Sequence, residues 1–260
     1  ALAIIGSYNG EVPFASWLKI SFKLNKKYGS TDRKQIAHLC YCYYRLGNAF
    51  EEKLPSEKIL IAVFLCSFRA SRVLEELRPE WNAAVELSLQ EKLEMLNATN
   101  EIEKIFPFKH ALSKEIDADA FARSFLLQPD LFLRVRPGKK KKAIDALQKN
   151  NINFEIVGED SFRLTNQEKI DEILSIDKDI VIQDLNSQRV LESLHPLLEI
   201  DSRIEVWDCC AASGGKSILF HDRFPNASIT VSDIRESIIN NLQNRFKKAG
   251  IVDYEFFVAD

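Results

Sequence analysis

The sequence lacks the features that are typical of a secreted protein, of a membrane protein and of a small domain stabilised by a metal ion. Its 260 residues include only five cysteines, an odd number without a Cys-x-x-Cys pair, which argues against a disulfide scaffold and against a zinc knuckle. No apolar run approaches the roughly 18 to 20 residues that span a bilayer, and the N-terminus lacks the pattern of a secretory signal. We therefore expect a cytoplasmic protein with reduced thiols and no membrane contact.

Neither sign of charge is in large excess, since 35 lysines and arginines are balanced by 38 aspartates and glutamates to a net charge of -3. With 46% hydrophobic residues, the composition is that of a globular protein and excludes disordered and collagen-like classes. The four histidines lie far apart without metal-ligand spacing, so we expect no metal site. The chain begins at Ala1 and its only methionine is Met95, so we expect a trimmed start, and a missing end must be considered too.

Helical spacing of apolar residues dominates the chain up to about Pro129. The spacing predicts a helix from Phe14 to Tyr28 that stops at Gly29, with Ser30 or Thr31 as the next N-cap. Further helices are predicted from there to a stop at Gly47, from Pro55 through Phe64, and from Val85 to Leu96. Residues 1–128 therefore read as a helical bundle.

The spacing of apolar residues is no longer helical throughout after Pro129. Leu131 to Val135 reads as a strand, Lys141 to Lys149 as a short helix, and Phe154 to Leu164 as a hairpin that turns at Gly158 to Asp160. We expect a small α+β module over residues 129–182.

Positive charge is concentrated where this module's first strand leads into its helix. The charged residues there are Arg134, Arg136, Lys139, Lys140, Lys141 and Lys142. A cluster of this sign can recruit a phosphate backbone, which makes these residues candidates for RNA binding. The alternative is that the four lysines are a solvated helix start.

A glycine-rich turn stands between a predicted strand, Arg203 to Trp207, and a predicted helix. The turn and its flanks read Asp208, Cys209, Cys210, Ala211, Ala212, Ser213, Gly214, Gly215, Lys216, Ser217. Glycines let backbone N–H groups approach a ligand closely at the start of a helix, which is typical of nucleotide binding. The phosphate-binding P-loop is disfavoured, because it needs a further glycine where this chain has Cys210.

An acidic residue closes the next predicted strand. Ser228 to Ser232 leads to Asp233, near the roughly 20-residue spacing at which a carboxylate accepts hydrogen bonds from a cofactor ribose. A helix N-cap is the alternative role for Asp233. A further helix capped by Gly250 and a strand from Tyr254 to Val258 follow, and the chain closes at Asp260.

These residues resemble a known family. Asp208 to Ser217 is similar to the first motif, Asp-x-Cys-Ala-Ala-Pro-Gly-Gly-Lys-Thr, of the Sun-type (RsmB-like) S-adenosylmethionine-dependent RNA cytosine-5 methyltransferases. The chain differs by Ser213 in place of the proline and Ser217 in place of the threonine. Elsewhere it is similar to the family's Gln-Asp-x-x-Ser element, its Leu-Arg-Val strand and the NusB-like helical domain of bacterial members, at Gln183, Asp184, Ser187, Leu133, Arg134, Val135, Tyr28, Gly29, Asp32, Arg33, Tyr44 and Arg45.

The resemblance implies a multi-domain α/β protein. Its parts would be a NusB-like RNA-binding domain at 1–128, an RNA-binding module at 129–182, and the first half of a Rossmann-like class I methyltransferase domain at 183–260. It also implies S-adenosylmethionine as cofactor, with the methionine portion held by Cys210 to Lys216, the ribose by Asp233 and the adenine near Asp260. Loss of the proline at Ser213 would loosen the turn, because proline fixes φ and serine does not.

The family's chemistry needs a cysteine thiolate that adds to the cytosine ring before methyl transfer. In the family this cysteine and a helper lie in Pro-Cys motifs, and the sequence contains no Pro-Cys pair. Cys209 and Cys210 belong to the turn, and Cys40, Cys42 and Cys66 lie on apolar helical stripes. We therefore expect the catalytic cysteines to lie beyond Asp260 and the chain as given to be inactive.

Two functions remain open. One is an RNA cytosine-5 methyltransferase, most simply acting on ribosomal RNA, and the other is a noncatalytic RNA-binding or ribosome-assembly factor that keeps a cofactor-binding half domain. The gene sequence after Asp260 separates them, since two Pro-Cys motifs would support the enzyme and an immediate stop the factor.

Overall fold

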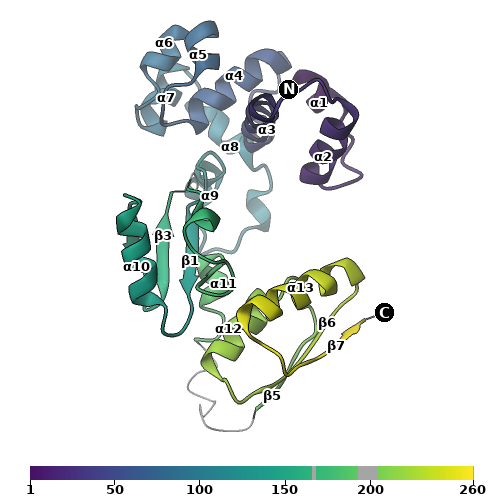
Figure 1. The fold of residues 1–260 in the computed structure, drawn as a ribbon. Helices are drawn as coiled ribbons and strands as arrows, with labels where there is room; N and C mark the ends of the chain where they lie inside the picture. Colours follow the sequence, from purple (N-terminus) through teal and green to yellow (C-terminus); the bar gives the residue numbers. More distant parts are fainter. Residues whose placement is uncertain (166–167, 193–203, 260) are drawn as a thin grey trace. The chain divides into compact units, whose positions relative to one another are not determined.

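The computed structural model describes residues 1–165, 168–192 and 204–259, and these form two compact units, Ala1–Gln128 and Pro129–Asp260 (Figure 1). The predicted boundary between residues 182 and 183 lies inside the second unit, between an antiparallel sheet and a parallel sheet.

The elements described in the first unit are all helical. They are α1 (Leu2–Ser7), α2 (Phe14–Leu24), α3 (Ser30–Arg45), α4 (Pro55–Cys66), α5 (Arg72–Leu77), α6 (Pro79–Ala83), α7 (Leu89–Met95), α8 (Ile102–Ile105) and α9 (Ala118–Ser124), with short 3-10 turns at Thr99–Glu101 and Lys109–Ala111. Helix α4 is the centre of this unit's core, because it is apolar on nearly all sides and packs against α3, α5 and α7. The predicted helical bundle is confirmed.

Helix ends differ from the prediction at two places. Helix α2 ends at Leu24, and Gly29 is the N-cap of α3 rather than the stop of α2, with its N–H donating to the Asp32 carboxylate at 3.0 Å. Helix α7 begins only after Ser88, whose hydroxyl accepts from the Glu91 N–H while the Glu91 carboxylate accepts from the Ser88 N–H. Both differences come from side-chain caps, which override the apolar spacing.

The first part of the second unit is a four-stranded antiparallel sheet in the order β2-β3-β1-β4. Its elements are β1 (Leu131–Val135), α10 (Lys140–Lys149), β2 (Phe154–Ile156), β3 (Ser161–Leu164) and β4 (Ile180–Ile182), with a 3-10 turn at Ile170–Glu172. Leu133 of β1 stands opposite Phe162 of β3 and Ile182 of β4, and Leu133 and Phe162 are buried beneath α10. The predicted strand, helix and hairpin are therefore present.

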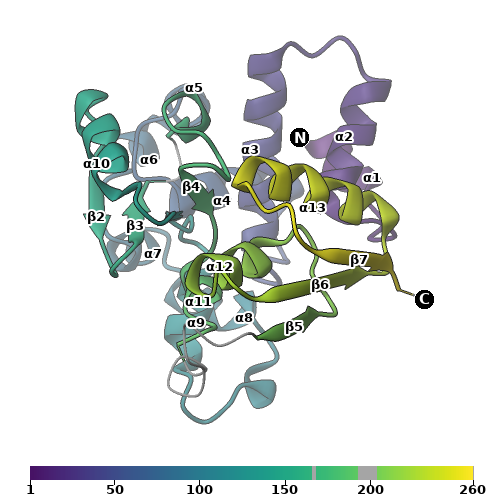
Figure 2. The same ribbon diagram turned by 60° about the horizontal axis from the view of Figure 1, so that its bottom comes forward.

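The second part is a three-stranded parallel sheet in the order β5-β6-β7, preceded by the short helix α11 (Leu185–Gln188). The sheet and its crossover helices are β5 (Glu205–Asp208), α12 (Gly215–Arg223), β6 (Ser228–Asp233), α13 (Glu236–Ala249) and β7 (Glu255–Val258). Both helices pack on the same face of the sheet, over Ile229 and Val231 (Figure 2). This is the strand–helix–strand–helix–strand beginning of a Rossmann-like domain.

The opposite face of this sheet is exposed. Trp207 of β5 and Phe257 of β7 are 61% and 44% exposed, with ring centroids 6.0 Å apart. Together the parts confirm the predicted fold class: a helical N-terminal region, a small α+β module and a partial Rossmann-like domain.

Candidate cofactor site

The glycine-rich turn joins β5 to α12, as predicted, and its shape depends on Gly214. This glycine has φ +78° and is the N-cap of α12. A Cβ at this position would lie 2.8 Å from Phe246 Cε1 and 2.9 Å from Leu242 Cγ, both on α13. Gly214 is therefore needed for its backbone conformation and for the close approach of α13.

Hydrogen bonds fix the turn to the neighbouring strand. The Ala211 N–H donates to the Ser232 carbonyl at 3.0 Å, and the Ala212 N–H donates to Asp233 Oδ2 at 3.1 Å. Ala212 itself has a left-handed φ of +46°, which costs about 1 to 3 kcal/mol and persists because these contacts hold it. At the other end, the Ser217 hydroxyl donates to Asp208 Oδ2 at 2.7 Å.

Asp233 lies at the end of β6, beside the turn. Its carboxylate accepts from the side chain and the backbone N–H of Arg235, and these bonds, with a smaller one from Ala212, hold the pKa of Asp233 below its ordinary value. The group is thus ionised at neutral pH and can accept hydrogen bonds from ligand hydroxyls. The N-cap alternative is not what the structure has, since the N-cap of α13 is Arg235.

A cavity of about 190 Å³ opens beside the turn. Of the predicted cofactor residues, it is lined by Cys210, Ala211, Ala212, Ser213, Gly215 and Lys216. Gly214 faces α13 instead, Asp233 lies outside the lining, and Asp260 lies outside the described residues. Since sites for whole small molecules begin at roughly 300 Å³, this cavity suits one end of a cofactor.

The two cysteines of the turn are exposed, whereas Cys40, Cys42 and Cys66 are buried in the helical unit. The neighbouring Cys209 raises the pKa of the Cys210 thiol above its ordinary value, which disfavours the reactive thiolate. An activated nucleophile needs a lowered pKa, so the raised pKa of Cys210 argues against a catalytic role for this thiol.

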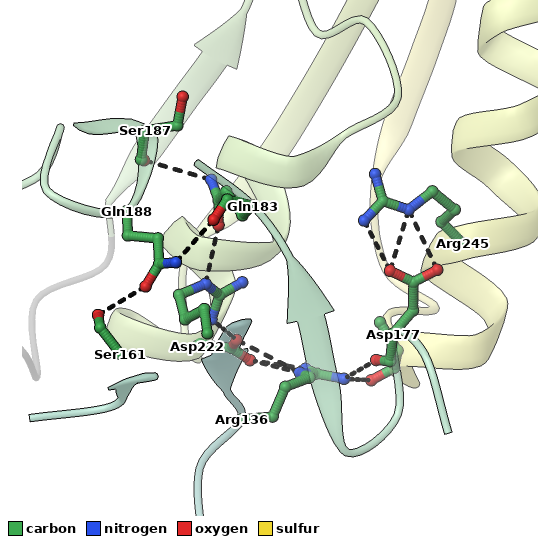
Figure 3. A network of polar contacts seen from close by, with 10 residues as sticks. Arg136, Ser161, Asp177, Gln183, Ser187, Gln188, Asp222 and Arg245 are labelled. Atoms are coloured by element: carbon green, nitrogen blue, oxygen red, sulfur yellow. Dashed lines mark hydrogen bonds and ion pairs between the residues drawn. The ribbon is translucent and has the colours of Figure 1, made fainter. Parts of the chain in front are cut away.

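Two residues assigned to RNA binding have another role. The side chains of Arg134 and Arg136 are only 5% and 11% exposed, and both form ion pairs with Asp222 of α12. Arg136 also donates to the carbonyls of Asp177 and Ala249 (Figure 3). The charge of Arg134 and Arg136 is therefore used inside the unit, between its two sheets, which disfavours the predicted contact of these arginines with RNA.

The lysines of the same run remain at the surface. Lys142 pairs with Asp179 at 2.6 Å and Lys140 donates to the Glu159 carbonyl, whereas Lys139 and Lys141 have no ion-pair partner among the described residues. Lys139 borders a groove of about 480 Å³ that is also lined by Lys178 and Lys248. Sequence reasoning missed these two lysines, because only the fold brings them beside the run.

The Gln-Asp element ahead of the parallel sheet connects the two sheets. Gln183 donates to the Ser187 carbonyl at 3.2 Å (Figure 3). It also accepts from Arg134 Nε at 3.0 Å, and Asp184 is the N-cap of α11. Gln183 also lines the cavity beside the turn.

Arg245 is a site residue that sequence reasoning missed. It comes from the middle of α13, and its Nη1 donates to the carbonyl and to the hydroxyl of Ser213 at 2.9 and 2.8 Å. The remaining guanidinium nitrogens bind the Asp177 carboxylate (Figure 3). An arginine between the apolar positions of a helix gives no local signal for this role.

No group of three metal-ligating side chains occurs within residues 1–165, 168–192 and 204–259. Across the same residues, every helix is too short or too polar to cross a membrane.

Comparisons with known proteins show the fold. Searches with protein-family models and against curated proteins gave no match. The crystal structure of a protein named PH0851 is similar with a TM-score of 0.57 at 17% identity, covering 99% of this chain and 67% of that one. This likeness supports the fold described above.

Two other solved structures match more weakly. One is a methyltransferase homologue from Pyrococcus horikoshii, with a TM-score of 0.48 and 19% identity over 64% of this chain and 54% of that one. The other is NSun6 from Pyrococcus horikoshii with SFG, with a TM-score of 0.41 and 12% identity over 50% of this chain and 58% of that one. The chain thus spans little more than half the length of these two proteins.

Proposed function

We propose that this chain is the cofactor-binding and RNA-binding portion of an S-adenosylmethionine-dependent RNA cytosine-5 methyltransferase of the Sun type. The observation that carries the proposal is the turn after β5, whose motif residues line a cavity while its backbone is hydrogen-bonded to the carboxylate of Asp233. In this assignment Cys210 to Lys216 bind the methionine portion and Asp233 binds the ribose hydroxyls.

The chain's own residues supply binding and orientation. Gly215 and Lys216, the first residues of α12, line the cavity, and the backbone N–H groups at a helix start favour a carboxylate such as that of methionine. The ionised Asp233 accepts from a ribose. None of the five cysteines is placed as a nucleophile, so residues 1–260 alone should give no methyl transfer.

Cofactor binding is tested by calorimetric titration with S-adenosylmethionine. We expect Asp233→Ala to weaken binding by roughly 1 to 3 kcal/mol, because a charge-assisted hydrogen bond is lost. Asp253→Ala, at an exposed carboxylate in the loop before β7, is the matched control and should bind like the wild type. Equal affinity of both variants would refute the placement of the ribose.

The RNA partner, most simply ribosomal RNA, would meet the lysines Lys139, Lys140, Lys141 and Lys142 together with Lys178 and Lys248. Replacing Lys139, Lys178 and Lys248 by glutamine should weaken binding to unrelated RNA sequences alike, and each lost phosphate contact should reduce the salt slope by about 1. Lys149→Gln, at the far end of α10, is the control. An unchanged salt slope in the triple variant would favour the solvated-helix alternative.

A further inference from the structure

Ser213 stands where the family motif has a proline, so the backbone of the cofactor turn lacks the restraint of a proline ring at this position. Ser213 lies between two residues with left-handed backbone, Ala212 at φ +46° and Gly214 at φ +78°. A proline between them would restrict the backbone, and a serine does not. The turn therefore needs another restraint to keep its N–H groups in place.

Arg245 supplies two bonds at this position. Its Nη1 donates at 2.9 Å to the Ser213 carbonyl and at 2.8 Å to the Ser213 hydroxyl. The second acceptor exists only because residue 213 is a serine, since proline has no hydroxyl. The substitution that removes the rigid ring thus adds a point of attachment.

Asp177 holds Arg245 in position for this contact. Arg245 Nε donates to both oxygens of the Asp177 carboxylate, at 3.0 and 3.1 Å, and Nη2 donates to Oδ1 at 2.6 Å. The side chains are 16% and 3% exposed, so the pair is shielded from water. A fork-like, charge-assisted contact of this kind fixes the plane of the guanidinium.

The turn that carries Asp177 belongs to the antiparallel sheet. Asp177 has φ +68°, its N–H donates to the Ile180 carbonyl at 2.7 Å, and its carbonyl accepts from Arg136 Nη1 at 2.9 Å. The conformation of Asp177 is therefore set by β4 and by Arg136. Through Arg245, this turn is connected to the cofactor turn of the parallel sheet.

We propose that Arg245 is a positioning residue for the cofactor, which clamps the turn through Ser213 and is itself aimed by Asp177. The clamp replaces the restraint of the family's proline and makes the small α+β module part of the cofactor site. This inference rests on the proposed binding of S-adenosylmethionine.

A double-mutant cycle tests the clamp by calorimetry with S-adenosylmethionine. Arg245→Met should weaken binding roughly tenfold or more, and Ser213→Ala should weaken it less, because only the hydroxyl bond is lost. In a Ser213→Pro background the loss on adding Arg245→Met should fall below about threefold, since the ring fixes the backbone. Lys247→Met, an exposed lysine on the same helix, is the control.

Hydrogen exchange of the ligand-free chain gives a readout that does not need the cofactor. Arg245→Met should speed exchange of the amides of Ala212 and Gly214, and the added Ser213→Pro should slow it again. A variant that only lost global stability would speed exchange throughout the unit.

The outcomes separate the two proposals. A wild-type chain that binds no S-adenosylmethionine overturns the proposed function, and hydrogen exchange then decides the clamp. A wild type that binds while Arg245→Met binds equally well overturns the clamp. Equal losses from Arg245→Met in the wild-type and in the Ser213→Pro background also overturn it, because they indicate a general structural role.

Discussion

At the residue scale, hydrogen-bond donors and acceptors hold the cofactor turn in place, and we assign no catalytic role to its two thiols. Cys209 and Cys210 are exposed, but Cys210 has a raised pKa because Cys209 is beside it. In the helical unit, burial raises the pKa of Cys40 as well. Exposure therefore divides the five cysteines into two classes, two at the surface of the turn and three buried in the helical unit.

This division predicts an alkylation pattern. In the native chain, iodoacetamide should label Cys209 and Cys210, and all five cysteines should react after unfolding. A raised pKa means less thiolate at neutral pH, so the labelling rate at Cys210 should still increase with pH above the range where an ordinary cysteine has reached its plateau. Mass spectrometry of peptides checks this, and rapid native labelling of Cys40 would contradict the described burial.

At the element scale, the packing of α12 against α13 depends on a missing side chain. Gly214 and Gly250 have the same φ of +78°, but only Gly214 has neighbours within 4 Å of an added Cβ. Both glycines need a left-handed backbone conformation, but only at Gly214 would a side chain collide with its neighbours.

This pair gives a matched test by urea unfolding. Gly250→Ala should cost about 1 kcal/mol through backbone strain alone. Gly214→Ala should cost about 1 to 3 kcal/mol more, since the new methyl would collide with Leu242 and Phe246. We also expect only Gly214→Ala to weaken cofactor binding, and equal effects of the two changes would argue against the described contact.

Elements with a local signal could be predicted from the sequence, and contacts between distant residues could not. Strand β1 is a short run of apolar residues that contains one polar residue, Arg134, and the β2–β3 hairpin has turn residues at its centre. Strand β4 was missed, since its three residues Ile180–Ile182 are too few for a pattern. The pairing of Arg134 and Arg136 with Asp222 could not be predicted, because Asp222 lies far along the chain.

At the scale of the whole molecule, Asp222 joins the two sheets of the second unit. Its side chain is 5% exposed and binds both Arg134 and Arg136. Removing one partner from a buried ion cluster leaves the other charges uncompensated, which is far costlier than losing a surface pair.

We therefore expect Asp222→Ala to lower the free energy of unfolding by about 3 to 5 kcal/mol. Glu159→Ala, which removes an exposed carboxylate 3.8 Å from Arg223, should change it by less than about 0.5 kcal/mol. Urea unfolding followed by circular dichroism measures both changes. A small effect of Asp222→Ala would mean that the two sheets do not depend on this pairing.

The same buried charges limit how the unit can be recombined. In a chimera that takes its antiparallel sheet from another protein, that sheet must supply an arginine to pair with Asp222 and an aspartate to pair with Arg245. Otherwise each of these buried charges has no partner of opposite charge. Crossovers near residue 182 should therefore yield folded hybrids only when the donor carries this matched set. The two sheets should therefore be exchanged together, and a library of such chimeras would show the dependence as a strong selection for those charges.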